Sequence, residues 1–401
     1  MSASPFDESL NPSKLTPEAL AAQIRGWVAR TVQDEEVLAA VSGGVDSAVA
    51  TLIASQALGN RVHPLLLDTG FLRQDEPVLV EKLFNSASCV PLRVLRVEQR
   101  FFEATQNLED AEAKRVAFRE TFYSVLKEQA EETGSKWLLQ GTIAPDWIET
   151  AGGIKTQHNV LTQIGVRSEE KYGFKLLEPL AQLYKDQVRA LAQHLGLPEE
   201  FVRRQPFPGP GLLVRVPGKV SKRKLELLRR VTALVEQRLS VFEPSQWFAA
   251  VFDAPQRLAS EVVTGSVNWE FKQRVTGVRG DARVYGSLLS VGPASDAPIK
   301  RFDQEVYSLY QNQRTALREL SNSKTRFSRL CIRFAAKKDS STGYSLVIRA
   351  VKTSDYMTAD VLKPPYAELK YLAEELLEAD ESVVDVHYDV TPKPPATIEY
   401  E

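Results

Sequence analysis

Short apolar runs alternate with helical stretches over the first half of the chain, and this alternation restricts the fold more than any other feature. Runs of this length are typical of buried strands, and a helix between successive strands joins them in parallel. We therefore predict an α/β fold, with a doubly wound parallel sheet. The expected strands are 37–41, 62–68, 92–97, 137–140 and 175–180. A first helix is expected from Pro17, with Thr16 as its cap, and further helices are expected at 48–58, 76–84, 110–132 and 185–195.

A glycine-containing turn follows the first expected strand and leads into a helix. Its glycines allow a sharp turn, so that backbone amides and the helix N-terminus point at one place, which is an arrangement that binds phosphate. Its hydroxyl groups add donors, and its carboxylate could hold Mg²⁺. The turn has neither the GxxxxGK[ST] nor the GxGxxG pattern, so it predicts another kind of phosphate loop. It consists of Ser42, Gly43, Gly44, Val45, Asp46 and Ser47.

The composition changes at Pro206–Gly211, where three prolines and two glycines stand in six residues. Neither a helix nor a central strand tolerates such a segment, so we place a boundary there. The following residues predict a smaller α+β domain, with strands at 329–334, 345–351 and 383–390 and helices at 224–239 and 367–377. We expect a flexible tail at 1–16, a first domain at 17–206 and a second at 207–401.

Charge and cysteine content narrow the classes of protein. The 401 residues include 50 Lys and Arg and 52 Asp and Glu, a balance that disfavours an extensive nucleic-acid surface. Cys89 and Cys331 are far apart, which argues against a disulfide framework or a cysteine zinc site. No apolar run has the length of a membrane span, and the N-terminus does not read as a secretory signal. We expect a cytoplasmic protein with no nucleic-acid or membrane partner.

The phosphate loop resembles the pyrophosphate loop of the N-type ATP pyrophosphatases. Further motifs resemble, in order, those of the GMP synthetase family within that superfamily. The hinge and the C-terminal motif are the most specific, since the superfamily does not share them. The resemblance covers roughly 20–290 and 344–401, and it implies an ATP pyrophosphatase domain followed by a dimerisation domain. The motifs are 67–73, 140–149, 154–160, 206–211 and 393–401.

The resemblance also implies a reaction. In that family ATP adenylates XMP, pyrophosphate leaves, and ammonia then displaces AMP to give GMP. ATP and Mg²⁺ are thus the implied cofactors, and XMP and ammonia the other substrates. No glutaminase domain precedes the ATP domain in this sequence, so nitrogen would come from free ammonium or from a separate glutaminase subunit. The C-terminal domain implies a homodimer.

Residue roles follow from the same resemblance. Asp146 and Glu149 stand three apart, so a helical turn would put both carboxylates on one side, where they suit Mg²⁺ or the proton of ammonia. Lys155 and His158 complete the implied catalytic set, and Asp46 and Asp146 are the implied metal ligands. The ATP site would include the phosphate loop and Asp68, Thr69, Gly70, Gly141 and Thr142. The XMP site would consist of Arg215, Lys393, Thr397, Ile398 and Glu399.

Two positions depart from the family pattern, because Gln157 and Gln205 stand where His is common. Glutamine forms hydrogen bonds but does not exchange a proton near neutral pH, so an acid–base role at position 157 is excluded. Two alternatives therefore stay open: a related ligase that acts on a different purine nucleotide, and a nucleotide-binding regulator without turnover.

An insertion at about 292–343 has no counterpart in the short bacterial dimerisation domain and resembles the longer region of eukaryotic-type enzymes. We expect a helix at 304–320 in it. Its basic residues favour a solvated face over a partner-binding face. They are Arg301, Arg314, Arg318, Lys324, Arg326 and Arg329.

Overall fold

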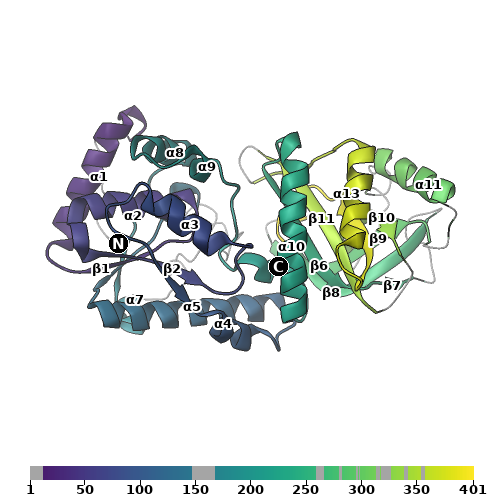
Figure 1. The fold of residues 1–401 in the computed structure, drawn as a ribbon, viewed down its shortest axis with the longest axis horizontal. Coiled ribbons are helices and arrows are strands. Elements are labelled where there is room, and N and C mark those ends of the chain that lie inside the picture. The colour runs from purple at the N-terminus through teal and green to yellow at the C-terminus, as the bar shows by residue number, and fades with distance from the viewer. Residues whose placement is uncertain are drawn as a thin grey trace. The chain divides into compact units, whose positions relative to one another are not determined.

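The computed structural model describes residues 12–146, 168–258, 266–279, 282–294, 297, 299–312, 317, 327–337, 342–353 and 357–401. The chain divides into two compact units (Figure 1). Unit 1 comprises 1–104 and 116–209, and unit 2 comprises 105–115 and 210–401. The chain therefore leaves unit 1 for the long part of unit 2 between residues 209 and 210, inside the segment Pro206–Gly211.

Unit 1 contains a five-stranded parallel sheet in the order β3-β2-β1-β4-β5. This confirms the expected parallel α/β sheet. The chain winds outward from β1 to β3 and then returns to the opposite side of β1 as β4, so the order reverses between β1 and β4. Ligands of such sheets bind beyond the carboxyl ends of the strands at this point. The strands are β1 (Val37–Ala40), β2 (Val62–Asp68), β3 (Arg93–Arg96), β4 (Trp137–Leu139) and β5 (Lys175–Leu177).

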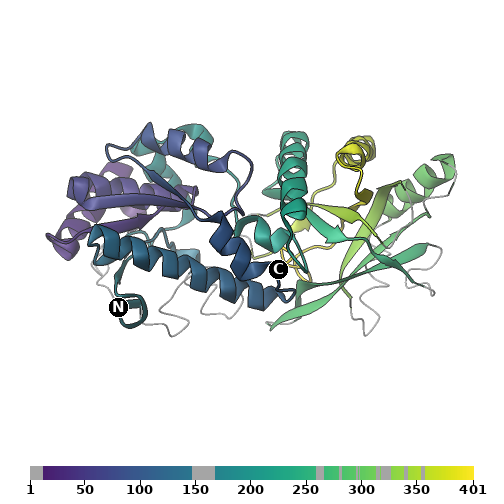
Figure 2. The ribbon, with the colours of Figure 1, turned by 60° about the horizontal axis from the view of Figure 1, so that its bottom comes forward.

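Helices cover both faces of this sheet, with α1, α2 and α8 on one side and α5 on the other (Figures 1 and 2). Thr16 caps α1 as expected, because its hydroxyl accepts from the Ala19 amide at 3.3 Å. Helix α2 begins at Val45, three residues before the expected Ala48, since Gly44 is the extended residue before the first turn. The helices are α1 (Pro17–Val32), α2 (Val45–Leu58), α3 (Glu76–Asn85), α4 (Glu98–Thr105), α5 (Ala111–Thr133), α7 (Ser168–Tyr172), α8 (Lys185–His194) and α9 (Glu199–Val202).

Unit 2 is a mixed sheet with helices, which confirms the α+β expectation. Its strands run in the order β12-β11-β13-β10-β9-β8-β7, and β6 pairs with β11. The pairs β8–β9 and β10–β13 are antiparallel, whereas β9–β10 and β11–β13 are parallel. The strands are β6 (Gln246–Asp253), β7 (Gln256–Arg257), β8 (Val267–Arg279), β9 (Ala282–Gly292), β10 (Phe327–Ala336), β11 (Tyr344–Lys352), β12 (Asp360–Val361) and β13 (Val383–Asp389).

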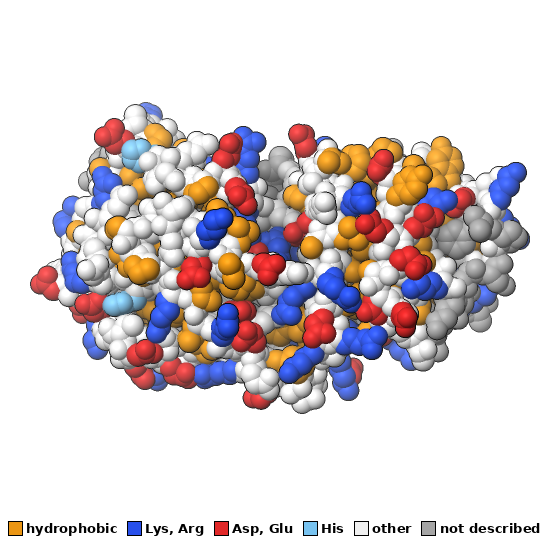
Figure 3. Space-filling view, viewed as in Figure 1, with side chains coloured by type: hydrophobic (Ala, Val, Ile, Leu, Met, Phe, Trp, Pro, Cys, Tyr) orange, Lys and Arg blue, Asp and Glu red, His pale blue; other side chains and the backbone are white. Residues whose placement is uncertain are grey.

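The helices of unit 2 are α10 (Lys222–Leu239), α11 (Ile299–Gln311) and α13 (Tyr366–Glu378). Helix α11 begins five residues before the helix expected at 304–320 and ends at Gln311, and most of the remainder of that expected helix lies outside the described residues. On the face shown in Figure 3, basic and acidic side chains are interspersed, in keeping with a net charge of −2. Among the residues that the structure describes, no helix combines the length and apolar character needed to cross a membrane.

Candidate active site

The phosphate loop joins β1 to α2 and is braced by its own hydroxyl groups. The Ser47 hydroxyl accepts from the Ser42 amide at 3.1 Å and donates to the Gly44 carbonyl at 3.0 Å. The Ser42 and Ser47 hydroxyl oxygens are 3.1 Å apart. Gly43 has a φ of +81°, which favours glycine, and no side chain caps the first turn of α2 at Gly44. The loop is thus held in shape with the helix N-terminus at the carboxyl end of the sheet.

Gly141 brings the loop after β4 against this helix N-terminus. A Cβ on Gly141 would lie 2.6 Å from the carbonyl carbon of Asp46, a backbone atom that cannot turn away. The close approach therefore requires glycine and fixes the two loops that flank the point of strand reversal. Gly141 and the phosphate loop, which the sequence assigned to one site, are in contact.

The loop after β2 carries the other expected ATP-site residues. The Asp68 carboxylate accepts from the Gly70 amide at 3.1 Å, and the Thr69 hydroxyl accepts from the Phe71 amide at 3.3 Å. Gly70 has a φ of +77°. Both side chains thus form a tight turn at the carboxyl end of β2.

Lys185, which the sequence analysis did not single out, contacts the phosphate loop through its side chain. Its ammonium donates to both carboxylate oxygens of Asp46, at 2.9 and 2.7 Å. The two side chains are 34% and 24% exposed, so a ligand can reach them. Lys185 is the first residue of α8, which follows β5. The only signal in the sequence was a cation at the start of a helix after an expected strand.

A second missed residue, Glu178, follows β5 and receives a hydrogen bond at 2.6 Å from the Thr142 hydroxyl. Burial raises the pKa of Glu178, the hydrogen bond from Thr142 opposes that shift, and the charge of Asp146 adds to it. The Asp146 carboxylate itself accepts from the Ile143 amide at 3.0 Å. Two carboxyl groups therefore stand close together in unit 1, with Thr142 held between β4 and β5.

Three of the expected catalytic residues, Glu149, Lys155 and His158, lie outside the described residues, as does Gln157. The expectation that Asp146 and Glu149 present their carboxylates on one side thus stays a prediction. Gln205 is described and is half-buried.

The expected XMP residues of unit 2 include a buried ion pair. Arg215 donates two hydrogen bonds to the Glu399 carboxylate, at 3.0 and 2.9 Å. The guanidinium also lies over the Phe248 ring, 4.0 Å from its centroid. Because both side chains are buried, these two charges orient each other and shape the surrounding segment.

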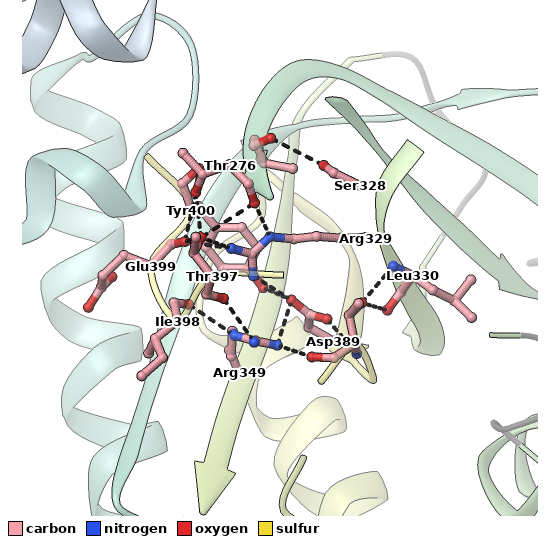
Figure 4. Close-up of polar contacts among 12 residues, drawn as sticks. Thr276, Ser328, Arg329, Leu330, Arg349, Asp389, Thr397, Ile398, Glu399 and Tyr400 are labelled. Carbon is pink, nitrogen blue, oxygen red and sulfur yellow. Dashed lines mark hydrogen bonds and ion pairs between the residues drawn. The ribbon is translucent and has the colours of Figure 1, made fainter. Parts of the chain in front are cut away.

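The remaining expected XMP residues lie on the C-terminal segment. Thr397 and Ile398 are bound by two buried arginines, Arg329 and Arg349 (Figure 4). Lys393 is held through its backbone, whose amide donates to the Ala359 carbonyl at 2.8 Å.

Arg329 corrects the interpretation of the insertion as a solvated basic face, since its side chain is fully buried. Arg301 is 72% exposed and fits that interpretation. The other basic residues named for the insertion, Arg314, Arg318, Lys324 and Arg326, lie outside the described residues.

Comparison with known proteins establishes the family of the chain. The model of the GMP synthase C terminal domain matches residues 335–400. The B subunit of GMP synthase [glutamine-hydrolyzing] from Sulfurisphaera tokodaii is 43% identical over 398 residues, which cover 98% of this chain and 100% of that protein. The chain belongs to the family of GMP synthase B subunits. Another member, from Saccharolobus islandicus (strain M.14.25 / Kamchatka #1), is 44% identical over 96% of this chain and 99% of that protein.

Among solved structures, NMN synthetase from Francisella tularensis matches 49% of this chain and 78% of its own, with 18% identity and a TM-score of 0.38. That likeness is weak beside the family match, which extends through both units of the chain.

Proposed function

We propose that this chain is the synthetase subunit of a two-chain GMP synthase. It would use ATP to convert XMP to GMP, with AMP and pyrophosphate as by-products and ammonia from a separate glutaminase subunit. The observation that carries this proposal is the 43% identity to the B subunit of a GMP synthase [glutamine-hydrolyzing] along the whole of that protein. The two alternatives, a different purine acceptor and a regulator without turnover, have no comparable support.

The first step would take place at the phosphate loop. The oxygen at C2 of XMP attacks the α-phosphorus of ATP, the bond from that phosphorus to the bridging oxygen breaks, and pyrophosphate leaves with the electron pair. Negative charge grows on the leaving group, and the N-terminal amides of α2 and the ammonium of Lys185 can neutralise it. The turn formed by Asp68, Thr69 and Gly70 would contact the adenosine.

In the second step ammonia attacks C2, and the bond between C2 and oxygen breaks with release of AMP. The attacking nitrogen must lose a proton, which requires a carboxylate or another base within reach. We propose Asp146 and Glu149 for this role, with Lys155 and His158 stabilising the charge of the adenylated intermediate. Glu178 would keep Thr142 in place beside them.

The residues fit a magnesium ion bound through phosphate. Among the described residues there is no group of three or more His, Cys, Asp or Glu side chains suited to a metal. Mg²⁺ commonly uses one or two carboxylates together with substrate phosphates and water, so Asp46 and Asp146 would suffice. A bound Mg²⁺ would supply positive charge to the phosphates. Asp46 would then exchange its contact with Lys185 for the metal.

For unit 2 we propose XMP binding by Arg215, Lys393, Thr397, Ile398 and Glu399, and a homodimer formed through this unit. Since Arg215 and Glu399 bind each other, the segment around Thr397 and Ile398 would offer the remaining contact surface. A cytoplasmic location is part of the same proposal.

The test is product formation by the purified protein with Mg-ATP, XMP and ammonium. We expect equal amounts of AMP, pyrophosphate and GMP with ammonium, and no GMP when glutamine replaces ammonium. Release of AMP only with another purine nucleotide would favour the alternative acceptor, for which Gln157 and Gln205 are the candidate determinants. Binding of ATP and XMP with no AMP formed would indicate the regulator. A Gly141→Ala variant is the negative control, since its Cβ displaces the phosphate loop.

A further inference from the structure

Two arginines bind the C-terminal segment Thr397–Tyr400 (Figure 4). They come from β10 and β11, which both pair with β13 in the sheet of unit 2. Arg349 of β11 donates to the Ile398 carbonyl at 2.9 Å and to the Thr397 carbonyl at 2.9 Å. Arg329 of β10 donates to the Thr397 hydroxyl at 2.7 Å and to the Glu399 carbonyl. The carbonyl groups of three successive residues are therefore held by guanidinium groups.

Asp389 of β13 fixes both arginines in place. One of its carboxylate oxygens accepts hydrogen bonds from Arg329 and from the Tyr400 hydroxyl, each at 3.0 Å, and forms an ion pair with Arg349 at 3.0 Å. The arginine and aspartate side chains have no exposed surface. Burial acts to raise the pKa of Asp389, but the two arginines outweigh it and keep the pKa low.

The charge balance explains why the C-terminal segment is part of this cluster. Two guanidinium groups share one carboxylate, so within this group of three side chains one positive charge is left to the surrounding dipoles. Buried charge is costly unless hydrogen bonds satisfy it, and the carbonyls of Thr397, Ile398 and Glu399 provide them. The segment cannot move away without leaving buried donors unsatisfied.

Strand β8 holds the segment as well. The Thr276 amide donates to the Tyr400 carbonyl at 2.8 Å, and the Thr276 and Thr397 hydroxyl oxygens are 2.6 Å apart. Arg329 also donates to the Thr276 carbonyl at 3.2 Å and lies over the Tyr400 ring, 4.3 Å from its centroid. Arg329 thus connects β8, β13 and the C-terminal segment.

We propose that Arg329, Arg349 and Asp389 are positioning residues for the XMP site: they fix Thr397, Ile398 and Glu399 in the shape that receives the purine nucleotide. This inference rests on the proposed function and adds to it a role for the insertion, since Arg329 belongs to β10. The binding energy of XMP then depends on side chains outside the C-terminal motif, because a pre-shaped segment loses less freedom when the ligand binds.

The chain offers a matched control for Arg329. Arg333 lies on the same strand, is 1% exposed, pairs with Asp385 at 3.2 Å and lies over the Trp269 ring, 4.4 Å from its centroid. Both Arg329→Gln and Arg333→Gln break a buried ion pair, but only Arg329 holds Thr397 and Glu399.

We expect Arg329→Gln to raise the KM for XMP about 30-fold, with the kcat at saturating XMP and the KM for ATP each within about 3-fold of wild type. Arg333→Gln should lower the melting temperature to a similar extent and change the KM for XMP less than about 2-fold. Arg329→Lys restores the charge but not the two-pronged contact, and should lie between Arg329→Gln and wild type.

A milder pair covers the case in which Arg329→Gln fails to fold. Tyr400→Phe removes the hydroxyl that donates to Asp389, whereas Tyr388→Phe removes a buried hydroxyl that donates to the Leu362 carbonyl at 2.7 Å. Only the first should raise the KM for XMP, by about 3-fold. The positioning role is wrong if Arg329→Gln and Arg333→Gln have the same KM for XMP, and Tyr400→Phe and Tyr388→Phe do as well. Wild-type protein that releases no AMP with XMP would instead overturn the proposed function.

Discussion

The phosphate loop of unit 1 and the C-terminal cluster of unit 2 both contain a lysine or arginine bound to an aspartate, but they differ in exposure. Lys185 and Asp46 are 34% and 24% exposed, whereas Arg349 and Asp389 have no exposed surface. A partly exposed pair contributes less to stability than a buried one, so its members can change partners when a ligand arrives. A buried pair cannot be opened at low cost, and it therefore defines shape. The first pair suits chemistry and the second suits positioning.

The largest expected effect is on the stability of the buried cluster. Arg349→Met leaves Asp389 with one arginine and frees the carbonyls of Thr397 and Ile398, so we expect the free energy of unfolding to fall by about 3–5 kcal/mol. Lys185→Met should change it by about 0.5 kcal/mol or less. Urea denaturation of both variants measures the difference.

The comparison fails if the two variants lose equal stability. Because a chain with two compact units need not unfold in a single step, the transition should be followed by signals from each unit. Trp27 and Trp137 report on unit 1, and Trp247 and Trp269 on unit 2. Single-tryptophan versions of the protein would assign the loss from Arg349→Met to unit 2.

The second effect is on catalysis at the partly exposed pair of Lys185 and Asp46. Lys185→Met removes the cation from the phosphate loop, so pyrophosphate release with saturating ATP, XMP and ammonium should slow by about 10²–10³-fold. Lys175→Met is the control, because Lys175 lies 3.9 Å from Glu35 at a surface position of the same unit. Steady-state assays of pyrophosphate measure both. Similar rates for Lys185→Met and wild type would remove Lys185 from the site.

The fold of unit 1 could be predicted because its signals are local. Each expected strand of its sheet is present to within three residues, and turn glycines such as Gly59 end helices where expected. In unit 2, β6, β8 and β9 were missed. Strand β8 alternates apolar and polar residues from Val267 to Lys272, a pattern that could have predicted a strand, but the alternation is lost where the register shifts between Phe271 and Arg274. Its place is decided by pairing with β9, which no local pattern reveals.

The residues of the candidate site also divide into those with a local signal in the sequence and those that depend on distant contacts. The phosphate loop and Gly141 could be identified from the sequence, because glycine and small hydroxyl residues after a strand have a local meaning. Lys185 and Arg329 could not, since the role that we propose for each depends on a partner 139 or 60 positions away, Asp46 or Asp389. A lysine at a helix start, or an arginine in a basic stretch, is most often solvated, and only the fold distinguishes these two.

A third effect, of about 3 kcal/mol, is on how the free energy of unfolding changes with pH, and it concerns a carboxyl group of unit 2. Burial raises the pKa of Glu401 to about 7, against the opposing effect of its ion pair with Lys114. In the unfolded chain the group titrates near its ordinary 4.5. Between these values the folded state holds the proton more tightly, so this group's stabilisation is present below pH 4.5 and is lost as the pH rises through about 7.

The Glu401→Gln variant tests this, since its amide cannot titrate. Its free energy of unfolding should change less than that of wild type between pH 4.5 and 7.5, as measured by urea denaturation at closely spaced pH values. A decline of equal size in both proteins would place the titrating group elsewhere. A buried ion pair can thus also make the free energy of unfolding depend on pH, when the attraction between its two members offsets only part of the effect of burial on the pKa.

The smallest expected effect concerns Thr142, which donates to the buried Glu178 in unit 1. Thr142→Val should cost about 1–2 kcal/mol at pH 7.5, because a buried carboxylate loses a hydrogen bond. Thr121→Val is the control, since that half-buried hydroxyl donates only to the Ala117 carbonyl within α5, as far as its described contacts show. Urea denaturation of both variants at several pH values gives the comparison.

The pH dependence of this cost identifies the charge state of Glu178. The hydrogen bond favours the ionised form, so the cost of Thr142→Val should shrink as the pH falls through the pKa of Glu178, which burial raises above 4.5. A cost that does not change with pH would mean that the hydrogen bond has the same strength to a neutral carboxyl. A cost that shrinks as the pH falls would show that Glu178 is ionised at pH 7.5 in the folded protein.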